Sequence, residues 1–496
     1  MTRPLTVLSS MMAGALALGL ASCAVGPNFK RPAPPSAPDY GSASSLAETA
    51  AVAGPAGEAQ RLVAGMDIPA QWWTVFGSPK LTRLVEQALK ANADLAAARA
   101  ALRQAEELHA AQRASFLPVL QGSADATRAK NAIGTIANPT SLPQSNPYYN
   151  LYTAQLSVSY LPDVFGATRR MVETSAAQAD SARFQLEATY LTLSSNVVVT
   201  AVQEAALRAE ITATERLLAL EHQLTDTVRG QRQLGTASEI DLLAQQSAEA
   251  QTAAALPPLR KLLGQTRDAL TALLGRLPSE EPAETFTLEE LTLPTELPVS
   301  LPSKLVEQRP DVRLAEANLH AASAQVGVAV ANLLPQFSLD AQLGSSAFKV
   351  GDLLGPYTRF WSAGASLTQT LFDAGALLHR HRAADAALDQ AAAQYRAAVI
   401  LACQNVADTL RALEADADAM KASTEADRAA LATFELARQQ RELGTISTTA
   451  LLNAEAVYQQ AQLAQAQARA SRYADTAGLF QALGGGWWNR AKEYSP

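Results

Sequence analysis

Four short segments of the chain alternate strictly between apolar and polar residues. In residues 150–162 the side chains at even positions from Tyr152 to Tyr160 are apolar, and those between them are polar. A period of two residues with one apolar face predicts a β-strand. The same pattern predicts further strands at roughly residues 118–128, 336–345 and 359–371.

These strands have the length of a tilted transmembrane strand, about 9–11 residues. Four strands cannot close a barrel, because the smallest barrels have about eight, and unpaired sheet edges cannot face lipid. If the strands lie in a membrane, the barrel must therefore be shared between subunits. A small soluble sheet that caps a helical bundle is the alternative explanation of the alternation.

The remaining apolar residues follow the helical period. We expect helices at roughly residues 79–115, 167–230, 239–274, 304–333, 374–443 and 447–483. In the two longest, apolar residues recur at spacings of four and three, the seam of a left-handed coiled coil. At 1.5 Å per residue these two helices measure roughly 95 Å and 105 Å. Pro257 and Pro258 are expected to break or kink the helix in which they lie.

The chain also repeats itself. QRQLGTAS at residues 231–238 returns as QRELGTIS at residues 440–447, an offset of 209 residues, and the Leu-Gly pair at 274–275 returns at 483–484. We interpret residues 61–304 and 305–485 as a tandem duplication, in which each half supplies helix, strand, strand, long helix, tight turn and helix. The first half ends in a Pro- and Glu-rich linker at 276–303, whose glutamates we interpret as solvated, and residues 486–496 form a C-terminal tail.

The repeated octapeptides predict helical hairpin tips. Gly235 and Gly444 stand where a helix C-terminus needs a left-handed residue. Ser238 and Ser447 then stand at the N-cap of the next helix, and Asp241 completes a capping-box-like pair with Ser238. Any antiparallel coiled coil needs such turns, but two near-identical copies at matched positions favour duplication.

The N-terminus has the features of a secretory leader. Residues 1–22 contain Arg3 and a long apolar run, and they end in Leu-Ala-Ser before Cys23, which resembles a bacterial lipobox. We expect cleavage before Cys23 and lipid attachment to its sulfur; the alternative is an ordinary signal peptide followed by an accidental cysteine. Residues 23–60, rich in Pro, Ala, Gly and Ser, predict an extended tether. No later segment has the roughly 18 uninterrupted apolar residues that a membrane helix requires.

Composition narrows the chemistry further. Apolar residues make up 48% of the chain, but alanine dominates them and aromatic residues reach only 6%, which favours close helix–helix contact over a bulky core. The net charge of −7 and the absence of a basic patch argue against nucleic acid as a partner. Cys403 is expected to be an inert small apolar residue. We expect no enzyme activity, no cofactor and no metal site, because there is no nucleophile motif, no phosphate loop and no metal-ligand spacing among the histidines. The histidines are His109, His222, His320, His379 and His381.

Several motifs in order along the chain carry a resemblance to a known family. They are CAVGPNF at 23–29 with Pro32, the Trp-Trp pair at 72–73 with Phe76, DVFG at 163–166, RPDV at 309–312, LFDAG at 371–375 and the two Leu-Gly-Thr tips. The chain resembles the TolC-type outer-membrane factors, and most closely their lipoprotein subgroup of NodT- and OprM-like efflux channels. The motifs cover nearly the whole chain.

The resemblance implies a mainly α-helical protomer with membrane β-strands, assembled as a homotrimer. Three sets of four strands would form a 12-stranded β-barrel in the cell outer membrane, continued by an α-helical barrel in the periplasm. It further implies two protein partners, a periplasmic adaptor (membrane fusion) protein and a proton-driven inner-membrane transporter. In this family the hairpin tips form the periplasmic aperture and the surface on which the adaptor docks.

Two site hypotheses follow from the resemblance. The aperture would be lined by Asp241, Glu239, Asn453, Arg232 and Arg441, and the adaptor would dock on Leu234, Gly235, Thr236, Leu443, Gly444 and Thr445. The sequence departs from the family pattern just after the second tip. Ala450 and Asn453 occupy positions where relatives often carry aspartates, and Ile446 stands where a linking arginine occurs. The charged lock would then be weaker than in relatives; the alternative is that these charges are merely solvated.

The leading interpretation is therefore the exit duct of a tripartite efflux pump that passes small molecules. A type I protein-secretion duct has the same architecture, although lipidation argues mildly against it. A lipid-anchored structural coiled-coil spacer is the alternative from a different class. The sequence does not identify the substrate, because passage through a wide duct places little chemical demand on single residues.

Overall fold

The computed structural model describes residues 24–41, 47–130 and 148–490. The expected signal peptide and Cys23 lie outside the described residues. The chain forms two compact units. Unit 1 comprises Met1–Arg31, Arg103–Asp180 and Ala317–Ala393, and unit 2 comprises Pro32–Leu102, Ser181–Glu316 and Gln394–Pro496.

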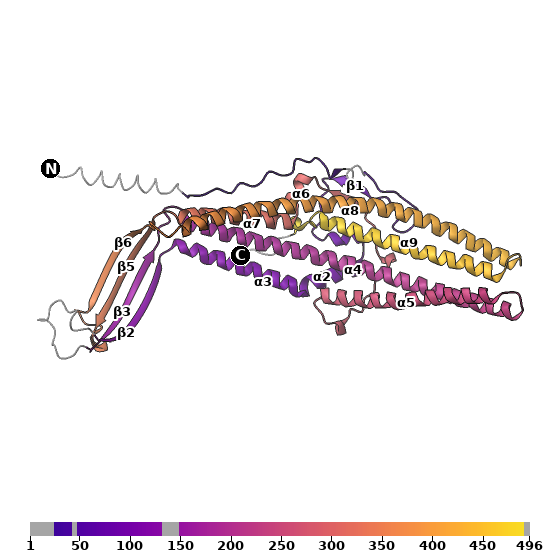
Figure 1. The fold of residues 1–496 in the computed structure, drawn as a ribbon, viewed down its shortest axis with the longest axis horizontal. Helices are drawn as coiled ribbons and strands as arrows, with labels where there is room; N and C mark the ends of the chain where they lie inside the picture. Colours follow the sequence, from indigo (N-terminus) through magenta and orange to yellow (C-terminus); the bar gives the residue numbers. More distant parts are fainter. Residues whose placement is uncertain (1–23, 42–46, 131–147, 491–496) are drawn as a thin grey trace. The chain divides into compact units, whose positions relative to one another are not determined.

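Unit 1 contains a four-stranded antiparallel sheet in the order β2-β3-β5-β6 (Figure 1). Its strands are β2 (Val119–Lys130), β3 (Tyr148–Tyr160), β5 (Gln336–Ala347) and β6 (Arg359–Thr368). Leu156, Leu343 and Trp361 form a cross-strand row, and their side chains are 53%, 60% and 76% exposed. The sheet therefore presents apolar side chains to its surroundings, and within the described residues one edge each of β2 and β6 has no partner strand.

An aspartate side chain caps the N-terminus of the long helix that follows each strand pair. After β3, Asp163 accepts hydrogen bonds from the backbone N–H groups of Thr168 and Arg169, both at 2.9 Å, where α4 (Ala167–Gln233) begins. After β6, Asp373 accepts from the N–H groups of Gly375 and Leu377 at 2.9 and 2.7 Å, where α8 (Ala376–Glu442) begins. Both contacts satisfy backbone donors that a helix N-terminus leaves unpaired.

The boundaries of the last two helices in each repeat agree with the duplication to the residue. Every bound of α8 and of α9 (Thr448–Ala482) lies 209 residues after the bound of α4 and of α5 (Glu239–Leu273). The long helices contain 67 residues each, about 100 Å at 1.5 Å per residue. The expected break at Pro257 and Pro258 is absent: α5 continues through both, since the pair removes only two backbone donors from a helix of 35 residues.

Two helices expected to be single are each divided in two. The range 79–115 forms α2 (Pro79–Ala91) and α3 (Ala93–Arg113), because Asn92 is extended at ψ 130° and its side-chain oxygen caps α3 by accepting from the N–H of Leu95 at 3.0 Å. The range 304–333 forms α6 (Pro302–Gln308) and α7 (Pro310–Ala331). There the residue before Pro310, Arg309, is kept out of the helical region and lies at ψ 123°.

The two breaks form equivalent joints within unit 2. The Asn92 amide donates to the carbonyl of Leu273, the last residue of α5, at 3.1 Å. The Arg309 guanidinium donates to the carbonyl of Ala482, the last residue of α9, at 3.0 Å. In each repeat, a hydrogen bond thus joins the C-terminal end of the last helix to the break in the first helix.

The linker at 276–303 belongs to the core of unit 2 and is not simply solvated. Its strand β4 (Glu296–Val299) pairs in parallel with β1 (Arg61–Ala64), and five of its apolar side chains are buried: Phe286, Leu288, Leu291, Leu293 and Leu297. Several of its glutamates form ion pairs at the surface, including Glu290 with Lys80 at 2.7 Å.

The expected tether is likewise packed over much of its length. In unit 2, the fully buried guanidinium of Arg472 donates to the carbonyls of Ala56 and Glu58, both at 2.6 Å, and to the Thr49 hydroxyl at 3.0 Å. The hydroxyl of Tyr40 donates to the carbonyl of Ser300 at 2.7 Å. The described residues before β1 form no helix or strand beyond an isolated bridge at Glu48, but from Tyr40 onward they make these buried contacts with the rest of unit 2, so the composition overstated the free part of the tether.

Candidate functional site

The first hairpin tip begins where α4 ends. Gly235 has a φ of +74°, its N–H donates to the carbonyl of Arg232 at 3.0 Å, and the N–H of Thr236 donates to the carbonyl of Gln231 at 2.8 Å. This pair of bonds is a Schellman motif, which closes a helix when the residue after its end is left-handed. The hydroxyl of Thr236 also donates to the Gln231 carbonyl at 2.9 Å.

The second tip has the same geometry. Gly444 has a φ of +72°, and its N–H and that of Thr445 donate to the carbonyls of Arg441 and Gln440 at 3.0 and 2.9 Å. A Cβ added at either tip glycine would meet no atom within 4 Å. The tip glycines are therefore needed for backbone conformation and not for close packing.

The two tips differ in the helix that follows. Ser238 and Asp241 form a full capping box, in which each side chain accepts from the backbone N–H of the other at 2.9–3.1 Å. The hydrogen bonds from Ser238 lower the pKa of Asp241 below its usual value. Ser447 caps α9 by accepting from Ala450 at 3.1 Å, but alanine cannot return the bond. The missing acid thus weakens the start of α9 as well as removing a charge.

The expected aperture residues divide between the tips. Arg232 forms an ion pair with Glu239 on the first tip. Arg441 donates to the carbonyl of Ile446 at 3.3 Å on the second, and Asn453 is exposed. Among the described residues, no hydrogen bond or ion pair joins one tip to the other. The apolar side chains Leu234 and Leu443 are 81% and 78% exposed, so both tips offer apolar surface.

Behind each tip, a cross-link between the paired helices escaped the sequence analysis. In the first hairpin His222 Nδ1 lies 2.8 Å from Glu249 Oε1 and Nε2 lies 3.7 Å from Asp226 Oδ2. Glu249 and the adjacent Asp226 raise the pKa of His222. In the second hairpin Tyr458, the counterpart of Glu249 at offset 209, stacks on Phe434 with ring centroids 6.0 Å apart. The 209-residue offset pairs Glu249 with Tyr458, but it pairs His222 with Leu431 and not with Phe434, so the repeat alone would not have predicted the second contact.

A second unforeseen cluster lies where α8 and α9 pack together in unit 2. Burial, followed by the neighbouring carboxyl group of Asp475, raises the pKa of Asp416 to about 7, while the nearby Arg472 opposes this rise. Neighbouring carboxylates repel each other, which favours the protonated form of Asp416. The pair has no counterpart in the first repeat, where Leu207 and Thr266 occupy the equivalent positions.

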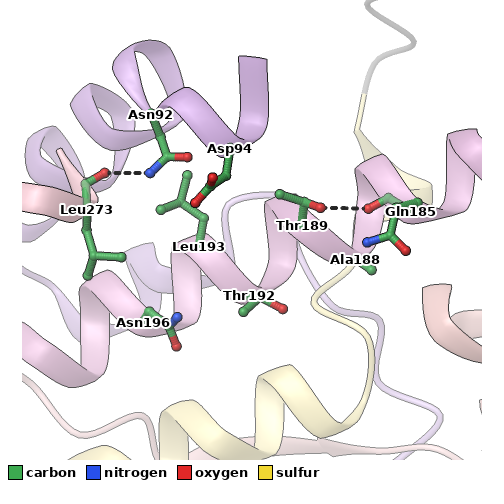
Figure 2. Close-up of a pocket in the computed structure, with 9 residues that line it drawn as sticks. All are labelled: Asn92, Asp94, Gln185, Ala188, Thr189, Thr192, Leu193, Asn196 and Leu273. Carbon is green, nitrogen blue, oxygen red and sulfur yellow. Dashed lines mark hydrogen bonds between the residues drawn. The ribbon is translucent and has the colours of Figure 1, made fainter. Parts of the chain in front are cut away.

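Figure 2 shows an open groove beside the first joint, about 280 Å³ in volume. Asn92 and Asp94 lie on one side of it, and the Gln185, Thr192 and Asn196 side chains of α4 lie on the other. Within the described part of the chain, no group of three or more His, Cys, Asp or Glu side chains could hold a metal ion. Nor is any helix of those residues long and apolar enough to cross a membrane.

Comparisons with known proteins give a consistent result. A family model described as outer membrane efflux protein matches residues 84–276 and 301–485, one match for each repeat. The chain is 30% identical over 419 residues to the pyoverdine export outer membrane protein OpmQ of Pseudomonas putida KT2440, covering 84% of this chain and 88% of OpmQ. It is 26% identical over 494 residues to the outer membrane protein OprJ of Pseudomonas aeruginosa PAO1, covering 98% and 97%. Among solved structures it resembles the outer-membrane channel OprN, with a TM-score of 0.80, 28% identity and coverage of 94% and 100%.

Proposed function

Because the chain belongs to the outer membrane efflux protein family, we propose that it is the exit duct of a tripartite pump. Members of the family are outer-membrane efflux channels, so the fold class expected from the sequence is confirmed. The observation that carries the proposal is that one chain combines the family match in both repeats with a β-sheet that exposes apolar side chains. The chain would supply a passage without catalysis, and the energy for transport would come from a partner.

We propose that three copies complete the membrane barrel. The sheet of one chain leaves one edge each of β2 and β6 unpaired among the described residues, and open edges are too costly in lipid. Pairing β6 of one copy with β2 of the next closes the sheet. Three copies of a four-stranded sheet give a 12-stranded barrel, above the roughly eight strands of the smallest barrels.

The proposed partners are a periplasmic adaptor and an inner-membrane transporter driven by protons. Relatives carry names such as pyoverdine export protein and toluene efflux pump protein, which supports small organic molecules as the substrate class of this chain. We propose that the exposed tips, Leu234–Thr236 and Leu443–Thr445, bind the adaptor. A lipid on Cys23 would add an anchor at the outer membrane, with the helical part in the periplasm.

The tip geometry also refines the proposed aperture. Glu239 is neutralised by Arg232 and Asp241 is engaged as a helix cap, so the first tip carries one uncompensated acid in each copy. Asp241→Asn keeps an oxygen that can accept from the backbone and removes only the charge. We expect this variant to lower cation selectivity in single-channel recordings; unchanged conductance and selectivity would exclude a lining role. Asp408→Asn is the control, since Asp408 is an exposed acid of α8 outside the tips.

The proposed function is tested with the purified protein in planar lipid bilayers and with cells that lack it. Trimers that conduct ions distinguish a duct from a coiled-coil spacer, and restored export of dyes or drugs distinguishes efflux from protein secretion. Trimers without conductance, or cells that secrete a protein and no small molecule, contradict the proposal.

Docking at the tips has its own test. Replacing Gly235 and Gly444 together by Val places β-branched residues at φ values of +74° and +72°, which such residues avoid. Export should stop while trimers form normally. The same positions changed to Asn are the control, because Asn tolerates the left-handed conformation. Normal drug resistance in the Val variant would contradict docking at the tips.

A further inference from the structure

The first described residues of the chain bind to a site within unit 1, which we call the seat and which Arg170, Glu173, His320 and Gly327 form. The side chain of Arg170, on α4, is 5% exposed. Its Nε donates to the carbonyl of Val25 at 3.2 Å, and its Nη2 donates to the carbonyl of Gly26 at 3.3 Å and to the Asn28 Oδ1 at 2.8 Å. One buried cation therefore holds three acceptors of the N-terminal segment Ala24–Phe29.

A histidine of α7 completes the seat. The ring of Phe29 stacks on that of His320, with centroids 4.3 Å apart and 18° between the planes. Glu173 links the two sides: one carboxylate oxygen lies 2.9 Å from His320 Nε2, and the other accepts from Arg170 Nη1 at 2.7 Å. The aromatic and the cationic contacts of the segment are thus parts of one hydrogen-bonded group.

The backbone of the segment passes α7 too closely for side chains. A Cβ on Gly26, which has a φ of +90°, would lie 2.4 Å from Cα of Gly327, and a Cβ on Gly327 would lie 2.8 Å from the side chain of Arg170. Beyond this crossing, the N–H of Val25 donates to the carbonyl of Phe165 at 3.1 Å, in the turn between β3 and α4. The segment is therefore fixed along its backbone as well as through its side chains.

The duplication gives an internal comparison for these residues. Where β6 leads into α8, His379 and Arg382 stand at the positions of Arg170 and Glu173, and the turn and the long helix still form. His320 and Gly327 belong to α7 of the second repeat. In the equivalent helix of the first repeat, α3, Arg103 and Ala110 stand in their place, at the offset of 217 residues that separates Ala93 from Pro310. Each of these elements therefore forms in one repeat without the residues that it carries in the other, so the fold itself does not require the four residues, and what distinguishes α4 and α7 is the segment that they hold.

We propose that Arg170, Glu173, His320 and Gly327 form a binding site for the chain's own N-terminal segment, and that this site positions residue 23 for the membrane anchor. Residue 23 directly precedes Ala24, whose Cα lies 2.7 Å from where a Cβ on Gly166 would be. An acyl group on Cys23 would therefore start one residue from the turn that ends β3, and not at the end of a loose tether. The positioning role rests on the lipid anchor proposed above, whereas the seat does not.

The test uses full-length protein purified as trimers and measures hydrogen exchange at the amide of Val25, with the mass of the N-terminal peptide as a second readout. Arg170→Met removes the cation, and Gly327→Ala keeps it but crowds its side chain. Arg169→Met is the matched control, because this adjacent arginine pairs with Asp163 and has no bond to the segment. Cys23→Ser removes the site of the lipid.

We expect the Val25 amide to be protected in the wild type, in Arg169→Met and in Cys23→Ser. It should exchange about a hundredfold faster in Arg170→Met and Gly327→Ala, because the local opening is then no longer opposed by the charged hydrogen bonds. Equal protection in Arg170→Met, or loss of protection in Cys23→Ser, would overturn the proposal. A wild-type peptide without an acyl mass overturns the anchor and with it the positioning role, whereas the exchange rates decide the seat independently.

Discussion

Replacing Arg472 by Met should release the N-terminal stretch of unit 2 from α9. The guanidinium is fully buried and donates three hydrogen bonds to that stretch, at Thr49, Ala56 and Glu58. Methionine fills similar space but supplies no donor. The variant therefore leaves buried acceptors unsatisfied, which costs more than exposing them to water.

The magnitude follows from those contacts. Hydrogen bonds to a charged group contribute about 1.5–3 kcal/mol each, so three would give about 5–9 kcal/mol if they were independent. Burial opposes this gain, as the lowered pKa of Arg472 indicates, and the three bonds share one cation. We expect a net loss of about 3–5 kcal/mol, the range for removing one partner from a buried charged network.

The assay combines thermal unfolding of the purified trimer with hydrogen exchange over residues 47–60. Arg411→Met is the matched control, because Arg411 and its partner Asp408 are more than half exposed. Such a surface pair contributes about 0–1 kcal/mol. Exchange over residues 47–60 should accelerate only in the Arg472 variant. If both variants lose similar stability and leave that stretch protected, the reasoning about the buried arginine is wrong.

Three further changes test other parts of the structure. The pKa of Asp416 is raised from 3.8 to about 7, so the stability that this group contributes is complete below about pH 4 and is lost as the pH rises through 7. Asp416→Asn should flatten this pH dependence and stabilise the protein by about 1–2 kcal/mol at pH 8, as measured by thermal unfolding across pH. Glu249 raises the pKa of His222, so the cross-link behind the first tip is present at acid pH and lost at higher pH; His222→Ala should abolish the pH dependence of proteolysis at that hairpin. A Cβ on Gly484 would lie 2.4 Å from the carbonyl oxygen of Gln308 at a φ of +94°, so Gly484→Val should cost about 2–4 kcal/mol in thermal unfolding, and an unchanged melting temperature would show that the joint can relax.

The sequence allowed prediction of the fold where a pattern is periodic or repeated. Alternation identified the four strands of the sheet in unit 1, and the 209-residue offset paired the tips, including Gly235 with Gly444. The caps at Ser238 and Ser447 were also predictable, since they depend on residues three positions away. The breaks at Asn92 and Arg309 were missed, because one residue hardly disturbs the period of an Ala-rich helix and its capping partners are distant in the chain.

Separation along the chain also explains why the prediction of an extended tether at residues 23–60 was wrong for the part that packs against the rest of unit 2. Its composition is that of a tether, and the residue that holds it, Arg472, lies 416 residues after Ala56. The tip residues were placed correctly as turns, but a role in an aperture depends on neighbouring copies. The structure of one chain determines the helix caps and the ion pair of Arg232 with Glu239. It does not determine the contacts that neighbouring copies supply.

The two joints have a consequence for the ancestry of the fold. Asn92 fastens to Leu273 inside the first repeat, and Arg309 fastens to Ala482 inside the second. Each half therefore contains its own closing contact, as a gene for a single half would require. Six such half-length chains would carry the same joints and the same hairpin tips as three duplicated ones, and fusion in pairs would then have freed each half to diverge. The capping acid kept after one tip and absent after the other is a difference that only the fused gene can maintain.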